Sequence, residues 1–281
     1  MSAPAIHLHL IAYNEATLKG IGPGWLVLDN LANERPDWYE YWPIRRHLLA
    51  AEREGTLEDS AFYGFFSPKF TAKTGLNHAA VERFVADHAG SADVLLFSPQ
   101  PDMGAFFLNV FEQGETFDAG LIDAYDAFLA QVGRPVPLRQ LVMDARQVVF
   151  SNYFVARPAF WREWLGLNEA LFAACENPEP SALKRALTLP TSYGGGAQRK
   201  VFLMERAASL LLATQPHWRS VAHDPFGFGW STARFREHPQ EAFISDALKR
   251  AWRDTRWPEY MQAFAAVRER FIAAPPVRQA A

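Results

Sequence analysis

Residues Ala61–Leu76, AFYGFFSPKFTAKTGL, combine an aromatic run with an abrupt stop at Ser67-Pro68. The run predicts an inner strand. Proline ends it because proline cannot donate to a β-ladder and moves its predecessor out of helical geometry. Two lysines, Lys69 and Lys73, follow directly. Ligands of open α/β sheets bind at the carboxyl ends of strands, so these groups predict either an anion site or a solvated basic turn.

Strand and helix patterns alternate along the chain. Strands are also predicted at Ile6–Tyr13, Trp25–Leu28, Asp93–Phe97, Val148–Ala156 and Val221–Phe226. Helices are predicted at Ile44–Glu54, Asn77–His88, Phe117–Val132, Gln198–Thr214 and from Pro158 onward. This alternation predicts an α/β fold, with a Rossmann-like, mixed, mainly parallel sheet flanked by helices.

The end of the sequence predicts a helical appendage. Residues Ala242–Ile272 form a helical pattern interrupted at Pro258, with aromatic side chains on one side and arginines on the other. We therefore expect an α/β domain over residues 1–235 and a C-terminal helical appendage over residues 236–281, packed on that domain. The arginine and tryptophan content of the appendage allows contact with a membrane surface.

Composition limits the location and the partners. The net charge is −3 with no basic block, which argues against a nucleic-acid partner. Cys175 is the single cysteine, which rules out an internal disulfide and fits a reducing compartment. The sequence opens without the basic region of a signal peptide, and no apolar run approaches the roughly 18 residues of a membrane span. We expect a cytoplasmic protein, either free or peripheral at the inner membrane face.

Polar side chains follow the first two predicted strands. Asn14 and Glu15 follow Tyr13, and Asp29 and Asn30 follow the second strand. An acid beside an amide is suited to hydrogen bonding with a ribose or a base edge. Asp and Asn also begin turns readily, so both readings stay open.

Charged residues at the start of the predicted Ile44–Glu54 helix are a second candidate. Arg45 and Arg46 lie in its opening turns, where the helix dipole favours anions. They predict either ion pairs with Glu40 and Asp37 or contact with a bound anion.

Polar residues also interrupt apolar segments. Asn152 lies inside the predicted Val148–Ala156 strand, and burying an unpaired amide costs about 1–3 kcal/mol, so it predicts a core hydrogen bond or a cleft position. Glu205 and Arg206 lie within the apolar Gln198–Thr214 helix. Adjacent residues of a helix do not face each other, so these two should contact different neighbours.

Four stretches carry a resemblance to a known family: Tyr41–Leu48 (YWPIRRHL), Tyr63–Phe70 (YGFFSPKF), Ser151–Trp161 (SNYFVARPAFW) and Phe202–Leu212 (FLMERAASLLL). They resemble nucleotide-sugar-dependent glycosyltransferases of the GT-A type, in particular bacterial capsule and O-antigen polysaccharide biosynthesis proteins. The resemblance implies a GT-A-like fold and transfer of a sugar from a nucleotide-diphosphate sugar to a glycan or polysaccharide-precursor acceptor.

The resemblance also implies roles for the candidate residues. The nucleotide-sugar site would comprise Tyr13, Asn14, Glu15, Asp29, Asn30, Arg45, Arg46, Ser67, Lys69 and Lys73, and the acceptor side Asn152, Tyr153 and Arg206. An inverting enzyme needs a carboxylate base, for which Asp102 and Glu205 are the candidates. A retaining enzyme would not need that base.

One departure from the family concerns the metal. GT-A enzymes usually carry an Asp-x-Asp motif at a strand end, whereas here the comparable segment, Ser98–Asp102, has a single Asp. The chain would then use lysines or arginines in place of a metal, hold Mg²⁺ or Mn²⁺ through Asp102 and one further group, or be inactive. A catalytically silent binding protein of the same fold is therefore the main alternative. The sequence has no GxSxG hydrolase elbow and no P-loop.

Overall fold

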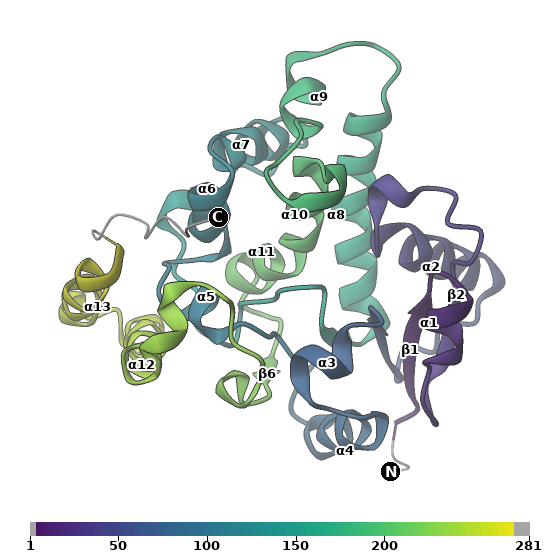
Figure 1. Cartoon of the computed structure of the whole chain (residues 1–281), viewed down its shortest axis with the longest axis horizontal. Helices are drawn as coiled ribbons and strands as arrows, with labels where there is room; N and C mark the ends of the chain where they lie inside the picture. Colours follow the sequence, from purple (N-terminus) through teal and green to yellow (C-terminus); the bar gives the residue numbers. More distant parts are fainter. Residues whose placement is uncertain (1–3, 273–281) are drawn as a thin grey trace.

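A six-stranded sheet runs through the part of the chain that the computed structural model describes, residues 4–272 (Figure 1). Its strands are β1 (Ile6–Ala12), β2 (Leu26–Asp29), β3 (Phe62–Phe66), β4 (Val94–Leu96), β5 (Phe154–Ala156) and β6 (Ser220–Ala222). Their spatial order is β2-β1-β3-β5-β4-β6. Only β5 is antiparallel to its neighbours, β3 and β4, whereas the pairs β1–β2, β1–β3 and β4–β6 are parallel. The prediction of a mixed, mainly parallel sheet flanked by helices is confirmed.

The helices connect these strands and flank the sheet (Figure 1). They are α1 (Glu15–Lys19), α2 (Tyr41–Glu54), α3 (Phe70–Thr74), α4 (His78–His88), α5 (Pro101–Ala105), α6 (Val110–Phe117), α7 (Leu121–Gln131), α8 (Pro158–Glu176), α9 (Ala182–Leu187), α10 (Arg199–Glu205), α11 (Ala207–Thr214), α12 (Pro239–Thr255) and α13 (Pro258–Ile272).

Strand β3 shows how the sequence builds the two-sided core. Successive side chains of a strand point to opposite faces, so Phe66 joins one apolar cluster with Val81 of α4, while Phe65 joins the other. On that second face, the Trp161 ring of α8 packs edge-on against Phe65, with 4.9 Å between ring centroids. A Cβ on Gly64, which precedes Phe65 in β3, would lie 2.8 Å from a methyl carbon of Val155 on β5. Glycine therefore permits the close approach of β3 and β5.

The predicted strand over Val148–Ala156 was wrong over its first two thirds, because only residues 154–156 pair as β5. Ser151 and Asn152 have φ values of 60° and 55°, a left-handed conformation that cannot continue a ladder. The polar residues therefore lie in a turn before the strand. Since β5 is antiparallel, that turn is placed at the carboxyl ends of β3 and β4.

Two helix predictions also need correction. The single helix expected over Gln198–Thr214 is divided into α10 and α11 at Arg206, whose backbone N–H bonds to the carbonyl of Leu203 in a tightened last turn. The helix expected over Phe117–Val132 starts later, as α7, because Gly120 has a φ of 87° and breaks the chain after α6.

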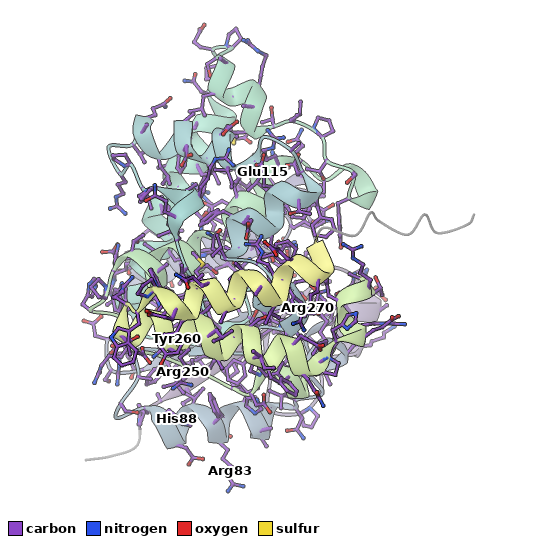
Figure 2. All side chains as sticks on the ribbon, turned by 90° about the vertical axis from the view of Figure 1, so that its left-hand side faces the viewer. Arg83, His88, Glu115, Arg250, Tyr260 and Arg270 are labelled. Carbon is purple, nitrogen blue, oxygen red and sulfur yellow. The ribbon has the colours of Figure 1, made fainter. Side chains whose placement is uncertain are left out.

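The C-terminal helices α12 and α13 pack side by side (Figure 2). Helix α12 also contacts α5. Lys249 of α12 is fully buried, and its ammonium donates to the carbonyls of Gly104 and Phe107 at 2.6 and 2.8 Å. Helical structure on both sides of Pro258 is as predicted. Within residues 4–272, none of the helices combines the length and the apolar character that crossing a membrane requires.

Candidate functional site

The segment after β3 places two lysines at the carboxyl end of the sheet. The strand ends at Ser67-Pro68 as predicted, and Lys69 and Lys73 lie at the start and near the end of the short helix α3. The Lys73 ammonium donates to the Ser151 hydroxyl at 2.8 Å and lies 5.6 Å from the centre of the Tyr153 ring. The hydroxyls of Ser67 and Tyr153 share a buried 2.7 Å hydrogen bond. The structure thus joins the β3 end to the turn before β5.

That turn is strained and incompletely satisfied. Ser151 and Asn152 both adopt the left-handed conformation, which costs a non-glycine residue about 1 kcal/mol or more. The buried side-chain oxygen of Asn152 has no hydrogen-bond partner within the described part of the chain. Backbone strain and an unpaired acceptor at the same turn are typical of functional sites, where contacts with a ligand offset the free energy that they cost.

The break between α10 and α11 brings Glu205 to the same turn. One Glu205 carboxylate oxygen accepts a 2.7 Å hydrogen bond from the Ser151 backbone N–H. Arg206 points elsewhere: it is buried and donates to the Val110 carbonyl at 2.8 Å and to the Gln113 side chain at 2.7 Å. The expectation that the two residues contact different neighbours is confirmed. Arg206 lies against α6, whereas Glu205 belongs to the site.

Glu40 is a site residue that the sequence reasoning missed. Burial and the nearby charge of Glu205 raise the pKa of the Glu40 carboxyl, while the ammonium groups of Lys73 and Lys69 oppose that shift. The residue before it, Tyr39, has a φ of 46° and a ψ of −128°, so the backbone is strained here too. An acid inside the aromatic sequence PDWYEYW was the available signal, but Glu40 was considered only as an ion-pair partner for the neighbouring arginines.

Tyr13 completes this cluster. It follows β1, its hydroxyl is buried without a hydrogen-bond partner among the described residues, and burial together with the charge of Glu40 raises its pKa. The cluster therefore contains two lysines, two glutamates and two tyrosines with buried hydroxyl groups, drawn from five separate segments. We call it the lysine–glutamate cluster: Tyr13, Glu40, Lys69, Lys73, Tyr153 and Glu205.

A charged network fixes the segment that carries Glu40. Asp37 accepts hydrogen bonds from Arg35 at 2.9 Å and from buried Lys200 at 2.6 Å, and Arg35 also donates to Glu176 of α8 at 2.8 Å. Burial alone would raise the pKa of Asp37, but the bonds from Arg35 and Lys200 lower it to about 2. The network ties the segment to α8 and α10, so the position of Glu40 is set by tertiary contacts.

Arg45 and Arg46 pair with residues other than those expected. Arg45 donates to Glu169 of α8 at 2.8 Å, and Arg46 lies 3.4 Å from Glu34 on the surface. The expectation of ion pairs with Glu40 and Asp37 was wrong because tertiary packing, and not sequence proximity, brings α8 against α2. Both arginines therefore have a carboxylate partner in this structure.

The polar pairs after β1 and β2 build local turns. Asn14 caps α1 through its side chain, and Glu15 is exposed and lies 3.5 Å from Lys19. Asp29 accepts from the Leu31 backbone at 2.9 Å, and buried Asn30 donates to Asn33 at 3.3 Å. These hydrogen bonds stabilise local turns, which is the second of the two interpretations given above. A role of these residues in ligand binding stays a prediction.

Asp102 is separated from solvent. It is fully buried in α5, and its two carboxylate oxygens accept from the backbone and the hydroxyl of Ser231. Among residues 4–272, no group of three or more His, Cys, Asp or Glu side chains is arranged to hold a metal ion. Mg²⁺ and Mn²⁺ prefer several oxygen ligands, so this donor set does not fit a metal centre built from Asp102.

Comparison with protein-family models, with curated proteins and with solved structures gave no match for this chain. The glycosyltransferase resemblance therefore stays a prediction, and functional inference depends on the site itself.

Proposed function

We propose that the chain is a glycosyltransferase that uses a nucleotide-diphosphate sugar, with the diphosphate held at the lysine–glutamate cluster. One observation carries the proposal. Lys73 and Glu205 both hydrogen-bond to Ser151 in the turn before β5, at the carboxyl end of β3, and the pKa of the Glu40 carboxyl responds to the charges of Glu205, Lys73 and Lys69. Cations suit the diphosphate, and a carboxylate suits removal of the proton from the acceptor hydroxyl.

The reaction assigned to this cluster is a displacement at the anomeric carbon. The acceptor oxygen forms a bond to that carbon while the bond from the carbon to the diphosphate oxygen breaks, and the nucleoside diphosphate leaves with the electron pair. Lys69 and Lys73 would stabilise the negative charge that develops on the leaving group. In an inverting reaction, Glu205 would accept the proton of the acceptor hydroxyl, and Glu40 would be the second carboxyl group at the reacting centre.

Thermal unfolding with UDP, GDP, dTDP and CDP, each with and without Mn²⁺, tests the proposal. A ligand that binds only the folded state raises the unfolding temperature by mass action, so we expect at least one nucleoside diphosphate to do so. No shift with any of the four would contradict the proposal. Binding without sugar transfer or donor hydrolysis would favour the alternative, a catalytically silent binding protein.

Variants locate the binding. Lys73→Ala should weaken diphosphate binding about 10- to 150-fold while changing nucleoside binding little, because a hydrogen bond to a charged group contributes about 1.5–3 kcal/mol. Ser151→Ala is the matched control, since it removes the 2.8 Å bond to Lys73 and keeps the ammonium charge. Lys19→Ala, at an exposed position in α1, controls for net charge. Equal losses of diphosphate and nucleoside binding in Lys73→Ala would assign Lys73 to structural support.

A further inference from the structure

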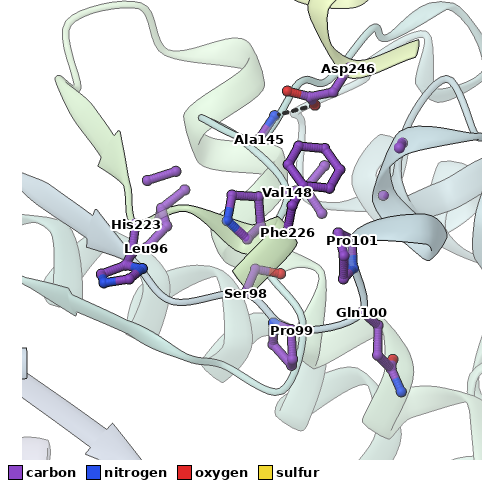
Figure 3. Close-up of a pocket in the computed structure, with 14 residues that line it drawn as sticks. Leu96, Ser98, Pro99, Gln100, Pro101, Ala145, Val148, His223, Phe226 and Asp246 are labelled. Carbon is purple, nitrogen blue, oxygen red and sulfur yellow. Dashed lines mark hydrogen bonds between the residues drawn. The ribbon is translucent and has the colours of Figure 1, made fainter. Parts of the chain in front are cut away.

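A pocket lies beside the lysine–glutamate cluster, at the carboxyl ends of the parallel strands β4 and β6 (Figure 3). Its cavity volume is about 20 Å³, enough for one water-sized group. The pocket is too small for a nucleotide, but it can accept a single hydroxyl or hydroxymethyl group from a ligand whose remainder stays at its mouth. We call it the Asp246 pocket, after the acidic residue in its lining.

Asp246 has a vacant hydrogen-bonding position. One of its carboxylate oxygens accepts a hydrogen bond from the Ala145 backbone N–H at 2.8 Å (Figure 3). The other oxygen accepts no hydrogen bond from a donor within residues 4–272. Burial raises the pKa of this carboxyl, the charge of Asp144 raises it further, and the ammonium of Lys249 lowers it. A ligand hydroxyl matches either protonation state because it donates to a carboxylate and accepts from a carboxylic acid.

Lys249 argues against a cationic ligand. Its ammonium already supplies a positive charge near Asp246, and both of its hydrogen bonds go to backbone carbonyls. A second cation would meet that charge in a poorly solvated place. An anion would face Asp246 itself. A neutral hydroxyl group is therefore the chemistry that the pocket accepts.

The walls of the pocket are mostly apolar. Prolines 99, 101 and 225, Val148 and Phe226 line it, and the polar side chains of the lining are Ser98, Gln100, His223 and Asp246 (Figure 3). The Phe226 ring is half-buried and is held edge-on by Phe243, at 4.5 Å between centroids. Apolar walls with few polar groups are typical of small-molecule sites. They suit a ligand with a carbon face as well as hydroxyl groups.

The pocket is connected through the backbone to the lysine–glutamate cluster. The N–H of Gly229 donates to the carbonyl of Lys73, and the Gly229 carbonyl accepts from Gln100 of the pocket, both at 2.8 Å. Gln100 has a left-handed φ of 59°, so this joint is also strained. On the other side, Ser98 of the pocket accepts from Phe150, next to the turn that binds Lys73. The two sites share one edge of the sheet.

We propose that the Asp246 pocket binds one hydroxyl group of a neutral sugar, hydrogen-bonded to Asp246, while the sugar ring stays at the mouth of the pocket with its carbon face against Phe226. Binding of the sugar does not depend on the proposed glycosyl transfer. The assignment of this sugar as the acceptor does rest on that proposed function.

The test is a titration of ¹³C-methyl-labelled full-length protein with methyl glycosides of glucose, galactose, mannose and N-acetylglucosamine. We expect saturable shifts of the Val148 and Leu96 methyl signals, which report from within the pocket. Cyclohexanol and cyclohexylamine serve as single-hydroxyl and cationic probes. Stronger binding of the amine than of every glycoside would overturn the assignment, and so would the absence of any pocket shift with all four glycosides.

Two variants test the contacts separately. Asp246→Asn and Phe226→Ala should each weaken glycoside binding about tenfold. Ile244→Ala is the control, because Ile244 is an exposed residue of the same helix, α12, that does not line the pocket. Two variants are used because Asp246 also supports the Ala145 backbone. Unchanged glycoside affinity in both would refute the proposal.

Nucleotide binding separates this proposal from the first. Asp246→Asn should retain any thermal shift with nucleoside diphosphates. Glycoside binding without nucleotide binding would support the sugar site at the Asp246 pocket and contradict the glycosyl-transfer proposal. Nucleotide binding without glycoside binding would support the nucleotide site and contradict the sugar site.

Discussion

Acid stability should depend on His9, a buried residue of β1. Its ring lies between His47 of α2 and Phe65 of β3, at 4.8 and 5.0 Å between centroids, and its Nδ1 has no hydrogen-bond partner among the described residues. His7 lies two residues away on the same face of β1 and adds to the charge that a protonated His9 would meet. Burial, followed by the charge of His47, lowers the pKa of His9 from 6.5 to about 3.

The sign of the effect follows from proton binding. Between pH 6.5 and about 3, the unfolded chain protonates this ring and the folded chain does not, so the free energy of unfolding falls as the pH falls through that window. A difference of one pKa unit corresponds to about 1.4 kcal/mol, so the shift of His9 amounts to about 5 kcal/mol at its upper bound. The pKa of His47 is also lowered by burial, which acts in the same direction.

Urea unfolding at pH 7, 6, 5 and 4.5 measures this dependence. In the His9→Phe variant, the free energy of unfolding should fall less steeply with falling pH than in the wild type, by up to about 1.4 kcal/mol per pH unit. This difference in slope is independent of the stability of the variant at pH 7. Phenylalanine keeps an aromatic ring beside Phe65 and has no proton to bind. His217→Phe, at an exposed position, is the matched control and should parallel the wild type. Equal slopes for His9→Phe and the wild type would refute the reasoning.

Two further predictions concern buried charges. Burial lowers the pKa of Lys249 from 10.5 to about 8, so the unfolded chain binds more protons than the folded chain between these pH values. The free energy of unfolding should therefore rise by up to about 3 kcal/mol from pH 8 to pH 10.5. In urea titrations Lys249→Met should abolish this rise, and a rise that persists in the variant would contradict the prediction. Asp102→Asn should lower the unfolding free energy by about 1–3 kcal/mol, because the buried bonds with Ser231 weaken. Unchanged stability together with the loss of a Mn²⁺-dependent nucleotide shift would instead make Asp102 a metal ligand.

Local chemistry predicted most of the strands and helices. Pro68 ends β3 and Gly55, with a φ of 65°, ends α2, so their positions in the chain marked real boundaries. The aromatic and β-branched residues before Phe154 favoured an extended strand, but Ser151 and Asn152 adopt left-handed conformations. This turn depends on bonds to Lys73 and Glu205, which come from distant segments, and no local pattern contains that information.

The candidate site was predictable only in part. Lys69, Lys73 and Glu205 were identified because charges stand out against an apolar run. Glu40 was not, because its surroundings are set by α8, α10 and the network around Asp37. Asp102 shows the converse: a carboxylate after a strand predicted a ligand, whereas its partner, Ser231, is 129 residues away.

The antiparallel strand β5 explains why one edge of the sheet concentrates so many polar groups. A parallel strand in that place would direct its polar leading segment to the amino ends of β3 and β4. Reversal places Ser151 and Asn152 at their carboxyl ends, between Lys73 on one side and Ser98 on the other. The same turn therefore separates the lysine–glutamate cluster from the Asp246 pocket and contacts the residues of both. The unpaired, buried oxygen of Asn152 lies in this same turn.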